Sequence, residues 1–149
     1  MQELNLPQYP LKIKEEGGTR YIFDSIRKKY LVLLPEEWVR QNFIQFLVRD
    51  KNYAASLIAI EKGLKLNELQ KRADIVIYDK QAKPIVLIEC KAPKVKINQE
   101  VFEQVARYNM VFKVPYLLVT NGLEHYCAKV NFETNSFEFL KDIPDYKEL

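Results

Sequence analysis

Residues 71–92, KRADIVIYDKQAKPIVLIECKA, decide the fold because they contain two nearly continuous apolar runs separated by a short polar stretch. Both runs are rich in β-branched residues, which is typical of strands buried on both faces of a sheet. One acidic residue interrupts each run: Asp74 at the start of the first and Glu89 late in the second. The stretch predicts a buried hairpin that carries one carboxylate on each strand.

The register of this hairpin follows from its loop, which we predict at residues 80–83. With that loop, Asp79 lies opposite Pro84, and Asp74 lies opposite Glu89 at the far end of the pair. Residues directly opposite each other have Cβ atoms about 4.5–5.5 Å apart on one face. The placement depends on this register, because a slip of one residue turns Glu89 to the other face.

Lys91 joins the same patch, because side chains two residues apart on a strand share a face. Two adjacent, partly buried carboxylates repel, and one takes up a proton unless a cation lies between them. A carboxylate-rich site suits Mg²⁺ or Mn²⁺, which could activate water against a phosphodiester, with Lys91 orienting that water. The alternative is a structural ion pair of Lys91 with Asp74 or Glu89 at the end of a sheet.

Two helices are expected. The first runs from Pro35 to about Arg49, because proline suits the first helical position and two acidic residues follow it. The second runs from about Asn98 to Phe112. Their predicted buried stripes are Val39, Phe43, Phe46 and Leu47 in the first helix and Val101, Val105, Tyr108 and Phe112 in the second.

The remaining runs predict strands around a central sheet, which makes the chain a mixed α/β protein. Gly17-Gly18 predicts the turn of an N-terminal hairpin within residues 11–25. Further strands are expected at residues 56–66, 116–122, 125–132 and 136–140. We expect one domain over residues 1–149, made of a hairpin extension (1–34), a core (35–122) and C-terminal strands with a tail (123–149).

Composition excludes several classes of protein. The 149 residues are 48% hydrophobic and 29% charged, which argues against a disordered or fibrous chain. No apolar run reaches the roughly 20 residues of a membrane span, and the two cysteines suggest no disulfide scaffold, so a cytoplasmic location is expected. The net charge of +3 is modest for a protein that binds nucleic acid by charge alone. The single histidine, His125, is expected to be structural.

Asp74 followed by Glu89-Cys90-Lys91 resembles the signature of the PD-(D/E)XK nuclease superfamily, although Ala73 stands where the motif has proline. Five blocks over about residues 9–126 are similar to the N-terminal nuclease domain of type I restriction enzyme R subunits. These blocks are PEEWVRQ (35–41), KRADIVIYD (71–79), LIECKAP (87–93), EQVARYN (103–109) and VTNG (119–122). The chain contains no GxxxxGK[ST] motif for the ATP-driven motor of full R subunits.

The resemblance implies a restriction-endonuclease-like αβββαβ core and Mg²⁺- or Mn²⁺-dependent hydrolysis of DNA phosphodiesters. It implies that Asp74 and Glu89 bind the metal and that Lys91 is the catalytic lysine. An acidic residue on the first helix often assists the metal in this superfamily. Glu36 is the candidate because it shares a face with the apolar stripe, whereas Glu37 points away; a role at the helix dipole is the alternative.

Gln104 and Tyr108 match a QxxxY motif that the resemblance links to catalysis and DNA contact, and they can share a helical face. For Tyr108, a core position is an equal alternative. Lys94 and Lys96 follow the catalytic strand and are candidates for phosphate contact, with a solvated loop as the alternative.

Two functions remain open at this stage. The intact acidic pair, Lys91 and Gln104 favour an enzyme, whereas the same fold could serve as a non-catalytic module that binds DNA or docks on another protein. The expected partners are DNA, a separate motor or methylase/specificity protein, and a second copy of the chain.

Overall fold

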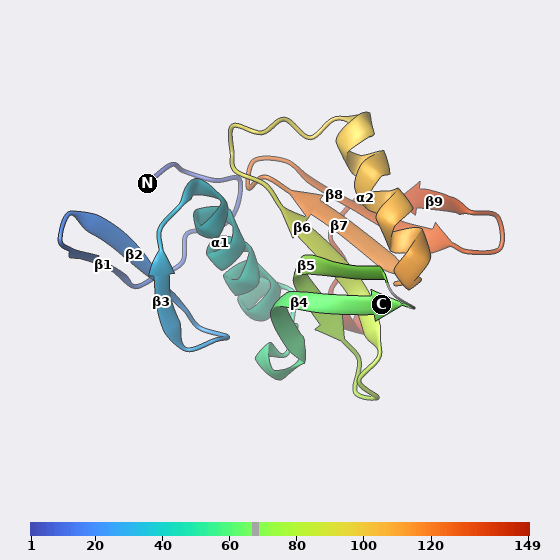
Figure 1. Cartoon of the computed structure of the whole chain (residues 1–149), viewed down its shortest axis with the longest axis horizontal. Helices are drawn as coiled ribbons and strands as arrows, with labels where there is room; N and C mark the ends of the chain where they lie inside the picture. Colours follow the sequence, from blue (N-terminus) through green and yellow to red (C-terminus); the bar gives the residue numbers. More distant parts are fainter. Residues whose placement is uncertain (67–68) are drawn as a thin grey trace.

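The computed structural model describes residues 1–66 and 69–149, with side chains described outside residues 61–72, 108, 110 and 111. Within this part, two sheets and two long helices form a mixed α/β fold (Figure 1). No helix in the described ranges is long and apolar enough to cross a membrane.

The N-terminal sheet contains the predicted hairpin and one strand that the sequence did not reveal. Its strands are β1 (Ile13–Glu16), β2 (Thr19–Asp24) and β3 (Lys29–Val32), in that order and antiparallel. Gly17 and Gly18 have φ angles of +57° and +80°, which explains why glycines form the turn. The third strand was missed because its four residues are mostly exposed and show no clear apolar alternation.

A six-stranded sheet forms the centre of the fold and contains all the other predicted strands. They are β4 (Ile58–Leu66), β5 (Leu69–Tyr78), β6 (Pro84–Cys90), β7 (Tyr116–Thr120), β8 (His125–Asn131) and β9 (Ser136–Phe139), and they pair in this order. Neighbours are antiparallel except for β6 and β7, which are parallel. A parallel pair needs a crossover connection, and α2 (Gln99–Phe112) supplies it.

Helix α1 (Pro35–Asp50) packs on one face of this sheet, as Figure 1 shows. It begins at the predicted proline, and Val39, Phe43 and Leu47 of the predicted stripe are fully buried. Two short 3₁₀ helices lie at Ala55–Leu57 and Tyr146–Glu148. The position of α1 over β5 and β6 sets the functional site, because its first turn reaches the ends of these strands.

Helix α2 packs on the opposite face, but its buried stripe is one residue later than predicted. Phe102 and Ala106 are 2% and 5% exposed, and Asn109 is buried at 1%. Asn109 is satisfied there because its side-chain amide donates to the Val114 carbonyl at 2.7 Å. Val101 and Val105, from the predicted stripe, are only partly buried, since the helix turns its larger Phe102 toward the sheet.

The predicted register between β5 and β6 is confirmed over its centre. Ile75 pairs with Ile88, and Ile77 pairs with Val86. The expected pairing of Asp79 with Pro84 is wrong, because the register shifts after Ile77 and Tyr78 lies opposite Pro84. The Asp79 carboxylate instead accepts the backbone N–H groups of residues 81 and 83, each at 2.9 Å, and so becomes part of the loop.

Candidate active site

Four residues predicted as functional lie near one another where β5, β6 and the first turn of α1 meet. Regular pairing of β5 and β6 ends at Ile75–Ile88, directly before Asp74 and Glu89. Asp74 raises and Lys91 lowers the pKa of both Glu89 and Glu36, so Asp74 and Lys91 lie near both acids. Lys91 directly follows β6, and its backbone N–H donates to the carbonyl of Thr120 on β7 at 2.8 Å.

Asp74 is held at this end of the sheet by two interactions. Its Oδ2 accepts the backbone N–H of Cys90 at 2.7 Å, where the regular ladder has ended. Its Oδ1 lies 3.6 Å from Nη2 of Arg40, and its side chain is 19% exposed. Because both oxygens have partners, the Asp74 carboxylate has a fixed orientation. Cys90 itself is buried among apolar residues on the α1 face, as alternation along the strand requires.

Glu89 is half-buried beside Asp74, and its pKa is the most perturbed among the acids of the site. Partial burial, followed by the charge of Asp74 and a hydrogen bond with it, raises the pKa of Glu89 to about 8. The ammonium of Lys91 acts in the opposite direction but does not compensate. These surroundings therefore oppose ionisation of both acids at once, the condition under which two carboxylates share a proton or bind a cation.

Glu36 is the acid of α1 that is directed toward the site, as the sequence predicted. Partial burial and the charge of Asp74 raise the pKa of Glu36, while Arg40 and Lys91 lower it. The expectation that Glu37 points away from the sheet is wrong. Its carboxylate lies 3.5 Å from Arg40 and accepts a hydrogen bond from the Gln41 amide at 2.8 Å, and its side chain is only 11% exposed.

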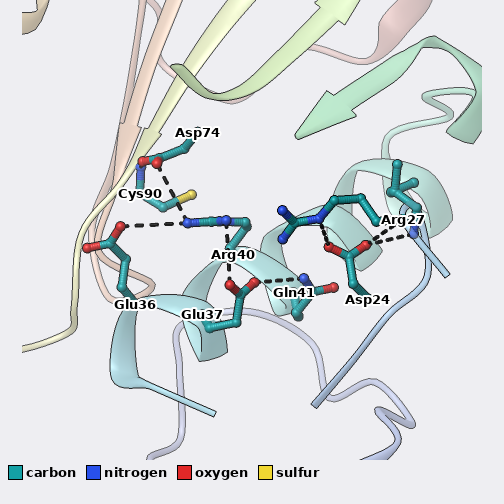
Figure 2. A network of polar contacts seen from close by, with 9 residues as sticks. Asp24, Arg27, Glu36, Glu37, Arg40, Gln41, Asp74 and Cys90 are labelled. Atoms are coloured by element: carbon teal, nitrogen blue, oxygen red, sulfur yellow. Dashed lines mark hydrogen bonds and ion pairs between the residues drawn. The ribbon is translucent and has the colours of Figure 1, made fainter. Parts of the chain in front are cut away.

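Arg40 brings a buried positive charge into the site that was not predicted from the sequence. Figure 2 shows its guanidinium between Glu36, Glu37 and Asp74. The Nη2 atom lies 3.7 Å from Glu36 and 3.6 Å from Asp74, and the arginine side chain is 6% exposed. A signal was present in the sequence, because Arg40 follows Glu36 by one helical turn and adjoins the buried Val39.

A second buried acid–arginine pair supports the neighbouring N-terminal sheet. The Asp24 carboxylate is fully buried, receives Nε of Arg27 at 2.7 Å, and accepts the backbone N–H groups of Ile26 and Arg27. Figure 2 shows this pair beside Gln41 but separate from the acids of the site. It stabilises the turn between β2 and β3.

The donor chemistry of the site fits a hard divalent cation. Carboxylate oxygens are the ligands that Mg²⁺ and Mn²⁺ prefer, and Asp74 and Glu89 form a partly buried pair that a cation would allow to ionise fully. Among the described residues, no group of three or more His, Cys, Asp or Glu side chains is arranged to hold a metal ion. Glu36, the expected third acid, is instead 3.7 Å from Arg40.

The residues predicted to contact DNA lie on α2 and in the connection that leads to it. Gln104 is exposed on α2. The side chain of Tyr108 lies outside the described residues. Lys94 and Lys96 are exposed in the connection between β6 and α2. The contacts of Lys94 and Lys96 with phosphate remain predictions.

Comparisons with known proteins agree with this architecture. The family described as the type I restriction enzyme R protein N terminus matches residues 35–144. A fragment of a protein assigned as the HsdR subunit of a type I restriction enzyme from Vibrio vulnificus YJ016 superposes with a TM-score of 0.56 and 19% identity. The match covers 78% of this chain and 24% of that one, and at this identity it shows the fold alone. The predicted restriction-endonuclease-like fold is confirmed. A search of curated proteins found no match.

Proposed function

Because this chain belongs to the family of type I restriction enzyme R protein N termini, we propose that it hydrolyses DNA phosphodiesters with Mg²⁺ or Mn²⁺. The observation that carries the proposal is the adjacent, partly buried Asp74–Glu89 pair, in which the pKa of Glu89 rises to about 8. Placing two acids side by side in partly buried surroundings costs stability, and a bound cation would offset this cost.

Each residue of the site has a separate proposed role. Asp74 and Glu89 would hold the metal, and Glu36 in the first turn of α1 would be a further acid beside it. A bound divalent metal supplies Lewis-acid polarisation of a phosphate oxygen and a water of lowered pKa. Lys91 is anchored through its backbone to Thr120, and its ammonium lowers the pKa of Glu89, which supports a position near the acids. Its proposed role is to orient a nucleophilic water or to stabilise charge on the phosphate.

DNA is the proposed substrate, and the nuclease-related family is the support for it. Lys94 and Lys96 lie exposed directly after the catalytic strand, where they can neutralise phosphates. Gln104 and Tyr108 are proposed to contact the DNA rather than the metal, since Gln104 is exposed on α2. We also propose that a motor or methylase/specificity protein, or a second copy of the chain, assists DNA binding.

A non-catalytic module that binds DNA or docks on a partner is the second candidate. It is favoured by the engagement of both Asp74 oxygens, one by the Cys90 N–H and the other by Arg40. If the protein is such a module, the guanidinium of Arg40 is the permanent counter-ion of Asp74 and no metal binds there. The two candidates differ in whether the acids bind a divalent ion.

Calorimetry with Mn²⁺ separates the two candidates. We expect binding by the wild type and none by Asp74→Ala, while Asp142→Ala, which removes an exposed acid far along the chain, binds like the wild type. Equal binding by the wild type and Asp74→Ala would contradict the proposed site. Absence of binding in all three proteins would favour the non-catalytic module.

A further inference from the structure

We propose that strand β9 and a cavity beside it form a docking site for an extended, basic segment of a partner protein. The cavity has a volume of about 450 Å³ and is lined by residues from the beginning of α2 and from strands β8 and β9. It lies on the α2 face of the six-stranded sheet, whereas Asp74 of the candidate active site contacts helix α1. The proposal is therefore independent of the proposed hydrolysis of DNA.

Aromatic side chains from three elements form the apolar wall of this cavity, namely Phe102 of α2, Tyr126 of β8, and Phe137 and Phe139 of β9. The ring centroid of Phe139 lies 4.8 Å from that of Phe102 and 5.4 Å from that of Phe137. Phe102 is 2% exposed, whereas Phe139 is 53% exposed, so the cluster is buried at its base and open at its rim. An exposed phenylalanine on an edge strand favours aggregation, and a partner that covers it removes this hazard.

The backbone of β9 is oriented to accept a further strand. In the part of the chain that the structure describes, β9 lies at one end of the six-stranded sheet (Figure 1). Phe139 lies opposite Ala128, and the N–H of Leu140 donates to the Cys127 carbonyl at 2.8 Å. Phe139 and Ala128 are therefore a non-hydrogen-bonded pair, and the N–H and C=O of Phe139 point away from β8. Phe137, two residues earlier, has the same orientation.

The charges at the cavity favour a cation over a nucleic acid. Of the described residues that line it, Glu103 is the one that carries a charge, and the Gln99 amide donates to its carboxylate at 3.0 Å. Glu124 adds a second carboxylate beside the cavity, because it accepts the hydroxyl of Tyr126 at 2.5 Å. Aromatic faces attract a guanidinium or an ammonium, and nearby carboxylates add to this attraction. The same carboxylates repel phosphate.

The geometry and the charges together define the partner segment. Side chains of an added strand alternate between the two faces of the sheet, so every second one lies on the same face as Phe137 and Phe139. A segment with arginine or lysine at alternate positions can thus pair with β9 and direct a cation into the cavity. The volume of about 450 Å³ is within the range of roughly 300–1,000 Å³ that is usual for binding pockets.

The first test is fluorescence anisotropy of the full chain with a labelled peptide in which threonine and arginine alternate. One matched peptide replaces arginine by citrulline, which is neutral and similar in shape. Another carries N-methyl groups on its backbone amides and cannot donate to β9. We expect each of these two peptides to bind about tenfold or more weakly than the arginine peptide. Equal binding by the citrulline peptide would contradict recognition of a cation, and equal binding by the methylated peptide would contradict strand pairing.

The second test measures binding of the arginine peptide by Phe139→Ala and Glu103→Gln. Both positions are exposed, so Glu103→Gln remains usable if Phe139→Ala does not fold. We expect Phe139→Ala to weaken binding about tenfold and Glu103→Gln to weaken it several-fold. The control is Glu138→Gln, which removes the same charge from the opposite face of β9 and should bind like the wild type.

Absence of binding by the wild type, or equal binding by the wild type and Phe139→Ala, overturns the proposal. Sedimentation tests a different occupant: a wild-type dimer that Phe139→Ala dissociates would show that a second copy covers β9. Binding of labelled single-stranded DNA that is weakened in Phe139→Ala, without binding of the arginine peptide, would show that the cavity binds nucleic acid instead. These measurements use neither a metal nor cleavage, so their failure is distinguishable from failure of the proposed nuclease.

Discussion

Arg40 Nη2 lies 3.6 Å from Asp74 Oδ1, so helix α1 contributes a cation to a site whose acids come from strands β5 and β6. The arginine side chain is 6% exposed and the aspartate side chain 19%. A pair this buried costs desolvation on both sides and persists only with further partners. Glu37 and the Cys90 N–H are among those partners. The acids are thus held in place by the fold itself.

Glu89→Gln should stabilise the metal-free protein. The substitution keeps the shape of the side chain and is neutral in both the folded and the unfolded chain, so folding no longer requires the proton uptake that burial and Asp74 impose on Glu89. We expect the free energy of unfolding in EDTA at neutral pH to rise by about 1–2 kcal/mol, or roughly 3–6 °C in Tm. The exposed Glu138→Gln on β9 is the matched control and should leave Tm unchanged. A clear loss of stability in Glu89→Gln would show that the Glu89 charge supports the fold.

His125 should make the protein less stable in mild acid. Its Nε2 lies 3.0 Å from the Asn5 carbonyl, which can only accept, so Nδ1 accepts the Thr120 hydroxyl at 2.7 Å and the ring is neutral. Burial lowers the pKa of His125 below its usual value of 6.5. On acidification, His125 is therefore protonated at a higher pH in the unfolded chain than in the folded chain. The free energy of unfolding consequently falls as the pH drops below about 6.5.

The measurement is Tm from pH 7.5 to 5.0 for the wild type and His125→Gln. We expect the wild type to lose more stability over this range than the variant does, because other groups titrate in both proteins. If Tm falls with pH to the same extent in the wild type and in His125→Gln, His125 has the same pKa in the folded and unfolded chain.

Gly122→Ala should destabilise the contact between the N-terminal segment and the β7–β8 turn. Gly122 has a φ of +86°, and an added Cβ would lie 2.8 Å from Leu4 Cδ2. Backbone strain and this clash together should cost about 1–3 kcal/mol of unfolding free energy in chemical denaturation. Gly17→Ala is the control, because its φ of +57° is also positive but no atom lies within 4 Å of the added Cβ. If Gly122→Ala and Gly17→Ala lose the same unfolding free energy, the clash with Leu4 makes no contribution to the effect.

The strands of the six-stranded sheet and the central register of β5 and β6 could be predicted from the sequence because that information is local. Ile75, Val76 and Ile77 face Ile88, Leu87 and Val86 as the apolar runs require. The pairing of Asp79 could not be predicted, because it depends on which backbone groups its carboxylate accepts in the loop. The same limit applies to α2, where two sets of residues one position apart both satisfy helical spacing, and only packing selects Phe102 and Ala106.

The acids and the lysine of the site were predicted because charged residues interrupt apolar strands. Arg40 was missed because nothing local says which turn of α1 approaches which strand end. An arginine one turn after a helix N-terminal glutamate more often forms an exposed i, i+4 pair. Burial of Arg40 depends on the tertiary contact between α1 and β5, and this contact is a property of the folded chain.

Cleavage by Lys91→Ala tests the central claim most directly. Plasmid nicking with Mg²⁺ or Mn²⁺ should be measured for the wild type and the variant, together with their melting curves and Mn²⁺ affinities. We expect the variant to fold, to bind Mn²⁺ and to keep much of its affinity for DNA. Its cleavage rate should fall at least about 10²-fold, as expected for the loss of a group that acts in proton transfer or water orientation. A stable Lys91→Ala protein that nicks DNA at the wild-type rate would contradict the assignment of this site as the catalytic centre.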